Sequence, residues 1–248
     1  IKINSNSRGR IKLVLNSEIS EFSSKVNEMS NSTSFNYHNL FDNNRLYGSD
    51  LPDNSNRIVY GLENKLVLNQ LQLNFLIGQS YDFKDNGNYL SKINQNENFS
   101  DVALESRVSN DFIKFSAKNR LDQKDLSNKE TNLSINLPSI FNSKIDYYQT
   151  SETAFSDLSS DRELLQLSLE EKFSDNFKFI YSSNLDVKDN YNPFEQSIGF
   201  SFYDECSQLD IVYTNTKFND NYNTKPTETI RFEFYMDYLG FVGYEQST

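Results

Sequence analysis

Residues Glu163 to Phe173 read ELLQLSLEEKF, and this stretch decides how the chain folds. Its apolar and polar residues alternate, with Leu165, Leu167 and Leu169 on one set of positions and polar side chains on the other. On a helix this spacing would scatter the leucines around the whole surface, whereas a β-strand places every second side chain on the same face. The stretch therefore predicts a strand with one apolar and one polar face.

The same alternation dominates the chain from about Arg57 onward. It is clear in FIKFSAKNRL (residues 112–121), in FKFIYSSNLD (residues 177–186) and in TETIRFEFYMD (residues 227–237). In the last two stretches, the positions that share one face carry Phe177, Phe179, Ile230, Phe232 and Phe234. Repeated strands of this kind predict an all-β protein.

The connections between the expected strands alternate between short turns and long polar loops. The short turns fall near residues 69–70, 109–111, 138–142, 174–176 and 204–205, and the long loops near residues 82–100, 122–129, 151–162, 187–193 and 217–226. An outer-membrane barrel has short turns at one end and long loops at the other, and its strands need about 9–11 residues to cross the bilayer. A soluble β-sandwich, the alternative, has no reason to place every long loop at one end.

We therefore predict an antiparallel, up-and-down transmembrane β-barrel. If GRIKLVLNSEIS (residues 9–20) is the first strand and residues 21–56 form a long outer loop, about twelve strands fit the chain. In such a barrel the apolar set, including Leu165 and Phe232, points outward to lipid.

Composition excludes several other classes of function. A net charge of −11 disfavours nucleic-acid binding, which needs a basic face. Cys206 is the only cysteine, and His38, which we interpret as a loop residue, is the only histidine. These counts argue against a Cys/His metal cluster and a histidine-based catalytic triad. No G-x-S-x-G motif occurs either, so we expect no enzyme, no metal and no cofactor.

Two segments resemble the lipopolysaccharide-assembly outer-membrane protein family LptD. They are NLFDNNRLYGSDLPDNSNRIVYGLENKL (residues 39–66) and YDECSQLDIVYTNTKFNDNYNTKPTETIRFEFYMDYLG (residues 203–240), which has a turn cysteine, a strand, a polar loop, a final strand and Leu-Gly. FLIGQSY (residues 75–81) and FSDVALESRVSNDFIKF (residues 99–115) look like the middle strands of that family's barrel. The chain departs from the family's pattern because it lacks tryptophan and has one cysteine where some members have an adjacent pair.

The resemblance implies insertion of lipopolysaccharide into the outer leaflet of the outer membrane of a Gram-negative bacterium. The implied partners are lipopolysaccharide, outer-membrane lipid, an LptE-like lipoprotein that plugs the lumen, and periplasmic bridge proteins that reach the barrel through an N-terminal domain. That domain and the first strands are absent from this chain, so we expect residues 1–248 to be the C-terminal portion of the barrel domain and to form either a curved open sheet or a strained smaller barrel. A passive porin-like channel is the alternative function within the same architecture.

In the LptD family the glycolipid is thought to leave between the first and last strands. The resemblance places the lateral-seam strand at residues 227–237, with Thr229, Ile230, Arg231, Phe232, Glu233, Phe234 and Tyr235 at its centre. Charged residues also occur on the polar faces of the expected strands, namely Lys114, Lys118, Arg120, Arg231, Glu233 and Asp237. They would line a wet lumen or the wall that faces the plug; contact with anionic groups of lipopolysaccharide is the alternative, and the sequence singles out no substrate site.

Cys206 follows Asp204 and Glu205 in a short turn, which the alternation of connections assigns to the periplasmic end. An odd cysteine in an exported protein indicates either a small packed thiol or a disulfide to a cysteine outside the chain. In the LptD family this turn cysteine bridges to the N-terminal domain, so the resemblance implies the disulfide.

Overall fold

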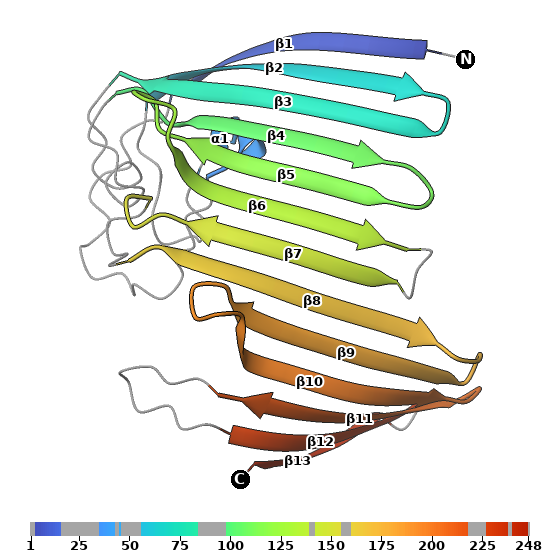
Figure 1. Ribbon diagram of the computed structural model, residues 1–248. Coiled ribbons are helices and arrows are strands. Elements are labelled where there is room, and N and C mark those ends of the chain that lie inside the picture. Colours follow the sequence, from blue (N-terminus) through green and yellow to red (C-terminus); the bar gives the residue numbers. More distant parts are fainter. Residues whose placement is uncertain are drawn as a thin grey trace. The chain divides into compact units, whose positions relative to one another are not determined.

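A computed structural model describes residues 3–15, 35–42, 45, 56–83, 98–138, 142–154, 160–217, 227–237 and 240–247. Within these ranges the chain forms thirteen strands and a short helix, α1 (Tyr37–Leu40). The strand order in the sheet follows the sequence from β1 to β13, as Figure 1 shows, and every described register is antiparallel. The predicted all-β, antiparallel, up-and-down fold is confirmed. No helix in the described part of the chain is long and apolar enough to cross a membrane.

The strands share the period-two pattern described above. They are β1 (Ile3–Leu15), β2 (Asn56–Leu68), β3 (Leu71–Asp82), β4 (Val102–Ser109), β5 (Lys114–Leu121), β6 (Asn128–Leu137), β7 (Ser143–Thr150), β8 (Arg162–Lys172), β9 (Phe177–Asp186), β10 (Asn192–Tyr203), β11 (Ser207–Thr216), β12 (Thr227–Met236) and β13 (Gly240–Ser247).

Short and long connections alternate between these strands, as expected. The strands leave only residues 69–70 between β2 and β3 and residues 204–206 between β10 and β11, but residues 83–101 between β3 and β4 and residues 217–226 between β11 and β12. Asn69 occupies the left-handed region (φ 53°), which asparagine tolerates in tight turns. Successive connections of an antiparallel meander lie at opposite ends of the strands, so the short turns share one end.

The structure has one strand more than the twelve expected. Residues 240–247 form β13, which pairs with β12 over eight residue pairs, from Thr229 opposite Ser247 to Met236 opposite Gly240. Because β12 is paired with both β11 and β13, residues 229–235 are not at the end of the strand order. Sequence reasoning missed β13 because Gly240 and Gly243 interrupt its apolar pattern. The order ends at β1 and β13, and no pairing joins these two in the described residues, so the sheet is open, which is one of the two expected forms.

The described residues group into two compact units, which we describe separately. The first takes residues 1–110, 115–133 and 148–162, so it holds β1 to β4, most of β5, and the halves of β6 and β7 next to the long connections. The second takes residues 111–114, 134–147 and 163–248, so it holds the other halves of β6 and β7 and nearly all of β8 to β13.

In the second unit, the register aligns apolar side chains of five successive strands into two ladders. From β9 to β13 the first ladder contains Phe179, Phe200, Ile211, Phe232 and Tyr244, and the second contains Phe177, Phe202, Leu209, Phe234 and Val242. Rings within a ladder touch: the centroids of Phe179 and Phe200 lie 5.3 Å apart. Most of these side chains are exposed, Phe200 by 55% and Phe232 by 42%. The expected shared apolar face of these strands is confirmed, and it forms a large uncovered patch.

The opposite face of the same strands is polar. Six successive strands, β8 to β13, place small hydroxyl side chains in one row, namely Ser168, Ser182, Ser197, Thr214, Thr229 and Ser247. Ser197 Oγ and Thr214 Oγ1 lie 2.9 Å apart. The second unit is therefore a sheet with one apolar and one hydroxyl-rich face.

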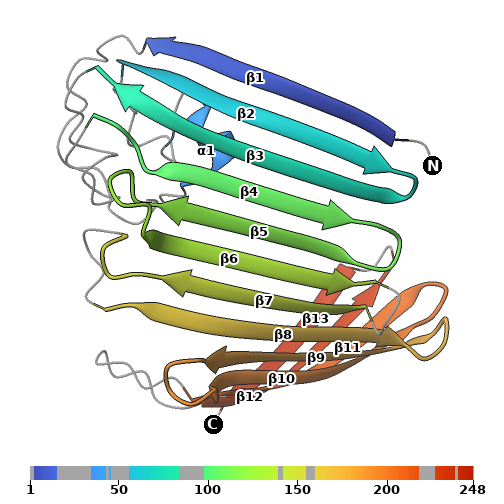
Figure 2. The ribbon, with the colours of Figure 1, turned by 45° about the horizontal axis from the view of Figure 1, so that its top comes forward.

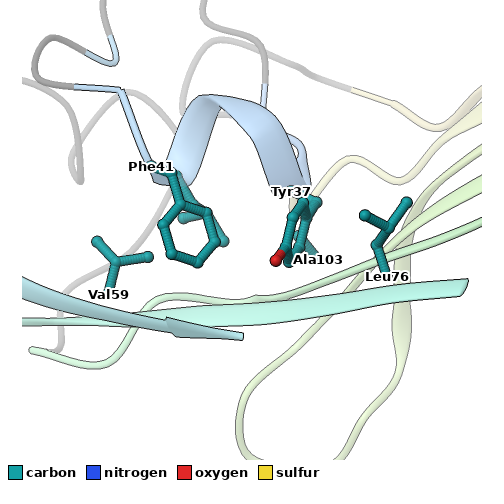
Figure 3. Close-up of a cluster of buried hydrophobic side chains, with 6 residues drawn as sticks. Tyr37, Phe41, Val59, Leu76 and Ala103 are labelled. Carbon is teal, nitrogen blue, oxygen red and sulfur yellow. The ribbon is translucent and has the colours of Figure 1, made fainter. Parts of the chain in front are cut away.

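The first unit repeats this two-faced pattern, and α1 covers part of its polar face (Figure 2). On the other face Ile11, Leu13 and Leu15 of β1 are exposed by 79%, 57% and 69%. The buried core is small and lies between α1 and the strands below it (Figure 3). It consists of Tyr37, Leu40, Phe41, Val59, Leu76 and Ala103. Among the described residues, the hydrophobic core thus lies only on the side of this sheet that faces α1.

Candidate functional site beneath the α1 segment

The α1 segment, residues 35–42, is the one stretch between β1 and β2 that the structure describes at length. Its helix starts at the N-cap Asn36, whose side-chain oxygen accepts a hydrogen bond from the backbone N–H of Asn39 at 2.9 Å. A helix of this length does not hold itself in water, so tertiary contacts must fix it. Those contacts define the site.

Two glycines form a seat for Tyr37. Gly61 of β2 and Gly78 of β3 lie directly opposite each other, and the Tyr37 ring covers both. A Cβ at Gly78 would lie 2.9 Å from Tyr37 Cδ2, and a Cβ at Gly61 would lie 2.7 Å from Tyr37 Cε2. Only glycine lets the Tyr37 ring approach the strands this closely, so Gly61 and Gly78 allow the α1 segment to pack against the sheet.

A polar network holds the other end of the Tyr37 ring. Tyr37 Oη donates a hydrogen bond to Glu63 Oε1 at 3.0 Å, and Arg10 Nη1 pairs with the same oxygen at 2.9 Å. The Arg10 guanidinium also lies 4.2 Å from the centre of the Phe41 ring. Burial, and next the hydrogen bond to Glu63, raise the pKa of Tyr37 to about 12, so the phenol stays protonated at neutral pH.

Charged side chains from the strands also bind the backbone of the α1 segment and the side chain of its neighbour Arg45. Lys12 Nζ donates to the carbonyl of Phe41 at 2.5 Å, and Arg57 donates to the carbonyl of Asp42. Arg45 and Asp82 form a fully buried ion pair with a shortest distance of 3.0 Å. Removing one partner of such a pair leaves the other charge buried and uncompensated, which is strongly destabilising.

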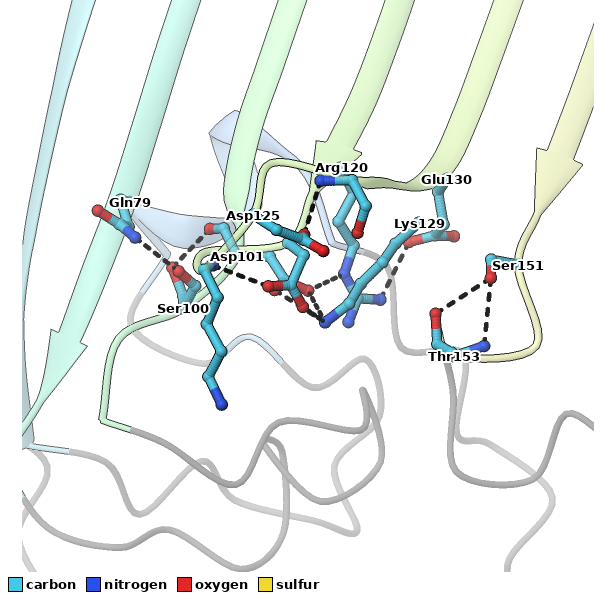
Figure 4. Close-up of polar contacts among 12 residues, drawn as sticks. Gln79, Ser100, Asp101, Arg120, Asp125, Lys129, Glu130, Ser151 and Thr153 are labelled. Atoms are coloured by element: carbon cyan, nitrogen blue, oxygen red, sulfur yellow. Dashed lines mark hydrogen bonds and ion pairs between the residues drawn. The ribbon is translucent and has the colours of Figure 1, made fainter.

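A second charge cluster lies where β4, β5 and β6 meet the long connections (Figure 4). Asp101 is fully buried and accepts hydrogen bonds from Arg120 Nε at 2.6 Å and from Lys129 Nζ at 3.0 Å. Arg120 Nη1 also binds Glu130 at 3.1 Å, and Lys129 also pairs with Asp122 at 2.8 Å. The cluster alternates in sign, so each buried charge has an opposite neighbour.

The loop between β5 and β6 has its own acidic anchors. Burial alone would raise the pKa of Asp122, but hydrogen bonds from Lys129 and from the backbone N–H of Lys124 outweigh it and hold that pKa below its usual 3.8. Hydrogen bonds from Ser127 likewise lower the pKa of Asp125. Both carboxylates stay charged above about pH 4 and fix the loop.

A cavity of about 280 Å³ opens between the α1 segment and the polar face of β4 to β7. The α1 segment supplies Phe35, Asn36 and Tyr37, and the strands supply Leu104, Glu105, Lys118, Asn119, Arg120, Glu130, Thr131, Asn132, Tyr148, Gln149 and Thr150. The Arg120 guanidinium lies 5.0 Å from the centre of the Phe35 ring. The cavity thus combines aromatic rings, hydroxyls, amides and both signs of charge.

The structure brings together some of the charged residues predicted from the sequence. Lys118 and Arg120 line the cavity, and Lys114 lies on the same face of β5. On β12, Arg231 and Glu233 form an ion pair with 3.3 Å between Nε and Oε1, in the other unit. Asp237 lies beyond β12, and its backbone N–H donates to the carbonyl of Cys206 at 2.9 Å.

Sequence reasoning missed Glu105, Asp101 and Glu130. Period two alone puts Glu105 on the polar face, since Ala103, Glu105 and Arg107 alternate with apolar or small residues. It gives no sign of the contact with His38, whose Nε2 lies 3.6 Å from Glu105 Oε2, because that contact depends on how the α1 segment docks. The structure places His38 in α1 and not in the loop expected from the sequence, and its ring lies against this carboxylate.

Cys206 lies in the short connection between β10 and β11, and its side chain is exposed. Because it is the only cysteine of the chain, these 248 residues hold no disulfide partner for it. Nor do the described residues contain any group of three or more His, Cys, Asp and Glu side chains that could hold a metal ion.

A long antiparallel meander with one exposed apolar face, one polar face and alternating connections has the strand pattern of outer-membrane β-barrel proteins. A family model described as "LptD: LPS transport system D" matches residues 20–177, which is more than half of the chain. The chain belongs to this family, which is one of lipopolysaccharide transport. Residues 178–248, with Cys206 and the seam residues, lie outside the matched part. No curated protein sequence matches the chain.

Proposed function

We propose that this chain forms part of the barrel wall of an outer-membrane translocon that inserts lipopolysaccharide into the outer leaflet of a Gram-negative outer membrane. Membership of the LptD family carries the proposal, and the two-faced sheet supports it. In this proposal, residues 1–248 are the C-terminal portion of the barrel domain. The N-terminal periplasmic domain and the first strands are supplied by the parent protein.

The two faces suit a glycolipid. The apolar ladders on β9 to β13 are of the kind that faces acyl chains. The hydroxyl row on the opposite face can donate hydrogen bonds to a polar head group and accept them from it. A molecule with acyl chains and a polar head needs both environments at once. The proposed function is therefore the transport of a glycolipid along a surface, and it involves no enzymatic reaction.

The exit route for the glycolipid belongs to the same proposal. We assign the lateral seam to the region of β12, with Thr229, Ile230, Arg231, Phe232, Glu233, Phe234 and Tyr235. Since β13 pairs with β12, opening at the seam has to separate β12 from β13 or use the outer edge of β13. Either separation exposes strand backbone, which lipid tolerates poorly, so an open seam must be short-lived or occupied.

The proposed partners follow from the proposed role. An LptE-like lipoprotein would contact the polar face, and periplasmic bridge proteins would deliver lipopolysaccharide through the N-terminal domain. Cys206 would form a disulfide with a cysteine of that domain, since it is exposed at a short turn of the kind that faces the periplasm. Thiol labelling of the mature full-length protein tests this last point: the disulfide requires that Cys206 reacts only after reduction, and full labelling without reductant contradicts it.

Depletion of the protein in its host tests the function itself. We expect less lipopolysaccharide at the cell surface, measured with a membrane-impermeant label, and greater sensitivity to large hydrophobic antibiotics. A passive porin-like channel predicts instead slower uptake of small hydrophilic solutes with unchanged surface lipopolysaccharide. A soluble β-sandwich predicts protein in the soluble fraction, without the change in gel migration on boiling that barrels show.

A further inference from the structure

One wall of the cavity beneath the α1 segment presents a carboxylate whose bonding is incomplete. Glu105 is 1% exposed, and its Oε1 accepts a hydrogen bond from Arg107 Nε at 2.7 Å. Its Oε2 accepts no hydrogen bond from the described residues, and His38 Nε2 lies 3.6 Å away. Buried polar atoms are normally bonded, so this oxygen marks a place for a donor that the described residues do not supply.

A cation lines the same cavity. The Lys118 ammonium forms no ion pair in the part of the chain that the structure describes, and its side chain is exposed. The neighbouring Arg120 differs, because Asp101 and Glu130 already neutralise it. Lys118 is therefore the charge in this cavity that remains available to an anion.

Aromatic and amide side chains complete the lining. Phe35 lies on the α1 segment, and Tyr148 and Asn132 lie on β7 and β6. Aromatic rings pack against apolar faces, and an amide can donate and accept at once. A ligand that meets this lining needs hydroxyls or an amine, one anionic group and an apolar face.

We propose that the cavity binds a single hydroxyl-rich sugar unit that carries one anionic group. A sugar hydroxyl donates to Glu105 Oε2, the anionic group accepts from Lys118, and the ring packs against Phe35. The volume of 280 Å³ is close to the lower end of ligand cavities, roughly 300–1,000 Å³, so it suits one sugar unit and not a chain of them. That this sugar belongs to the transported glycolipid rests on the proposed function, whereas the recognition chemistry does not.

Binding to the full-length protein in detergent micelles, measured by titration calorimetry, tests the proposal with three probes: glucuronate, glucose 6-phosphate and glucose. We expect saturable binding of at least one anionic sugar, and about tenfold weaker binding of glucose, which is about 1.4 kcal/mol. The comparison of glucuronate with glucose 6-phosphate tells whether the anionic group is a carboxylate or a phosphate.

Two substitutions separate the two contacts. Lys118→Met should weaken the anionic sugars about tenfold and leave glucose unchanged, because it removes only the charge-assisted contact. Glu105→Gln should weaken all three sugars, because every one of them uses a hydroxyl donor there. Lys114→Met is the matched control: Lys114 lies on the same face of the same strand but outside the cavity, and its loss should change no affinity.

The inference is wrong if none of the three sugars binds saturably, or if Lys118→Met and Glu105→Gln behave like Lys114→Met. Either result leaves the proposed function standing, provided that depletion still lowers surface lipopolysaccharide. Conversely, sugar binding with unchanged surface lipopolysaccharide after depletion would support the cavity and reject the transport role.

Discussion

Replacing Gly78 by alanine tests the seat of the α1 segment with the smallest change the chain offers. The new Cβ would lie 2.9 Å from Tyr37 Cδ2, whereas the nearest backbone atom, the carbonyl oxygen of Tyr60, is at an ordinary 3.4 Å. The crowding is therefore directed at the Tyr37 ring and not at the sheet. Gly61→Ala would be less selective, because its Cβ would also lie 2.8 Å from the carbonyl oxygen of Ile77.

The expected cost can be bounded from both sides. Overpacking a well-packed site costs about 1–3 kcal/mol. The cost cannot exceed that of lifting Tyr37 off the sheet, which removes the burial of a large ring, about 1.5–3 kcal/mol, and its hydrogen bond to Glu63, about 1 kcal/mol. We therefore expect Gly78→Ala to lower the free energy of unfolding by about 1–3 kcal/mol.

Urea unfolding in micelles measures this cost, and Gly9→Ala is the matched control. No atom lies within 4 Å of a Cβ at Gly9, so that variant should be neutral or slightly more stable, because alanine suits a strand better than glycine. In a Tyr37→Ala background the cost of Gly78→Ala should fall to nearly zero. If the cost of Gly78→Ala persists without the tyrosine ring, or if Gly78→Ala and Gly9→Ala behave alike, Gly78 is not required for the packing of Tyr37 against the sheet.

Three further predictions concern the charge cluster, the β5–β6 loop and the apolar face. Arg120→Met leaves the fully buried Asp101 short of a partner and should lower the free energy of unfolding by about 3–5 kcal/mol in urea titrations. The ion pair of Asp122 and Lys129 stabilises the fold above about pH 4, and because the pKa of Asp122 is lowered, this stability is lost as pH falls through that pKa; pH titration of stability should show a loss that Asp122→Asn lacks. Phe179→Lys, on the apolar ladder, should cost about 2–4 kcal/mol in a bilayer near its midplane, measured by unfolding from vesicles.

Each of these predictions has a control on the same strand or loop. Lys114→Met lies on β5 with Arg120 and should stay within about 0.5 kcal/mol of the parent. Asp125→Asn should leave the loss at low pH largely in place, since Asp125 forms no ion pair in the described residues. Ser182→Lys lies on the polar face of β9 and should be far milder than Phe179→Lys. Equal costs for the two β9 variants would contradict the assignment of faces.

Period two was enough to predict the strands, because one alternation fixes both the element and its faces. Phe177, Phe179, Ile230, Phe232 and Phe234 fall on a single face once the register is known, as their positions alone indicated. The pattern failed at β13, because Gly240 and Gly243 have no side chain and so do not show which face of a strand they would lie on.

The site beneath the α1 segment could be predicted only in part. Lys118 and Arg120 fall on the polar positions of a strand whose other face carries Phe115, Ala117 and Leu121, so their place on the polar wall follows from local sequence. Their cavity does not, because it requires residues 35–37 to return over strands that come much later in the chain. The local sequence around Gly61 and Gly78 likewise does not predict that they contact Tyr37. Their role becomes clear only when the register places them opposite each other on β2 and β3.

The central claim is that this two-faced sheet stands in a membrane with its apolar face toward lipid. Spin labels at successive positions of β12 test it most directly, in a Cys206→Ser background reconstituted in bilayers. Labels at Ile230, Phe232 and Phe234 should collide with lipid-soluble oxygen, and labels at Arg231 and Glu233 with a water-soluble nickel complex. Access to oxygen and access to the nickel complex that alternate in this way along β12 support the account. Uniform access to the nickel complex, or no alternation along the strand, contradicts it.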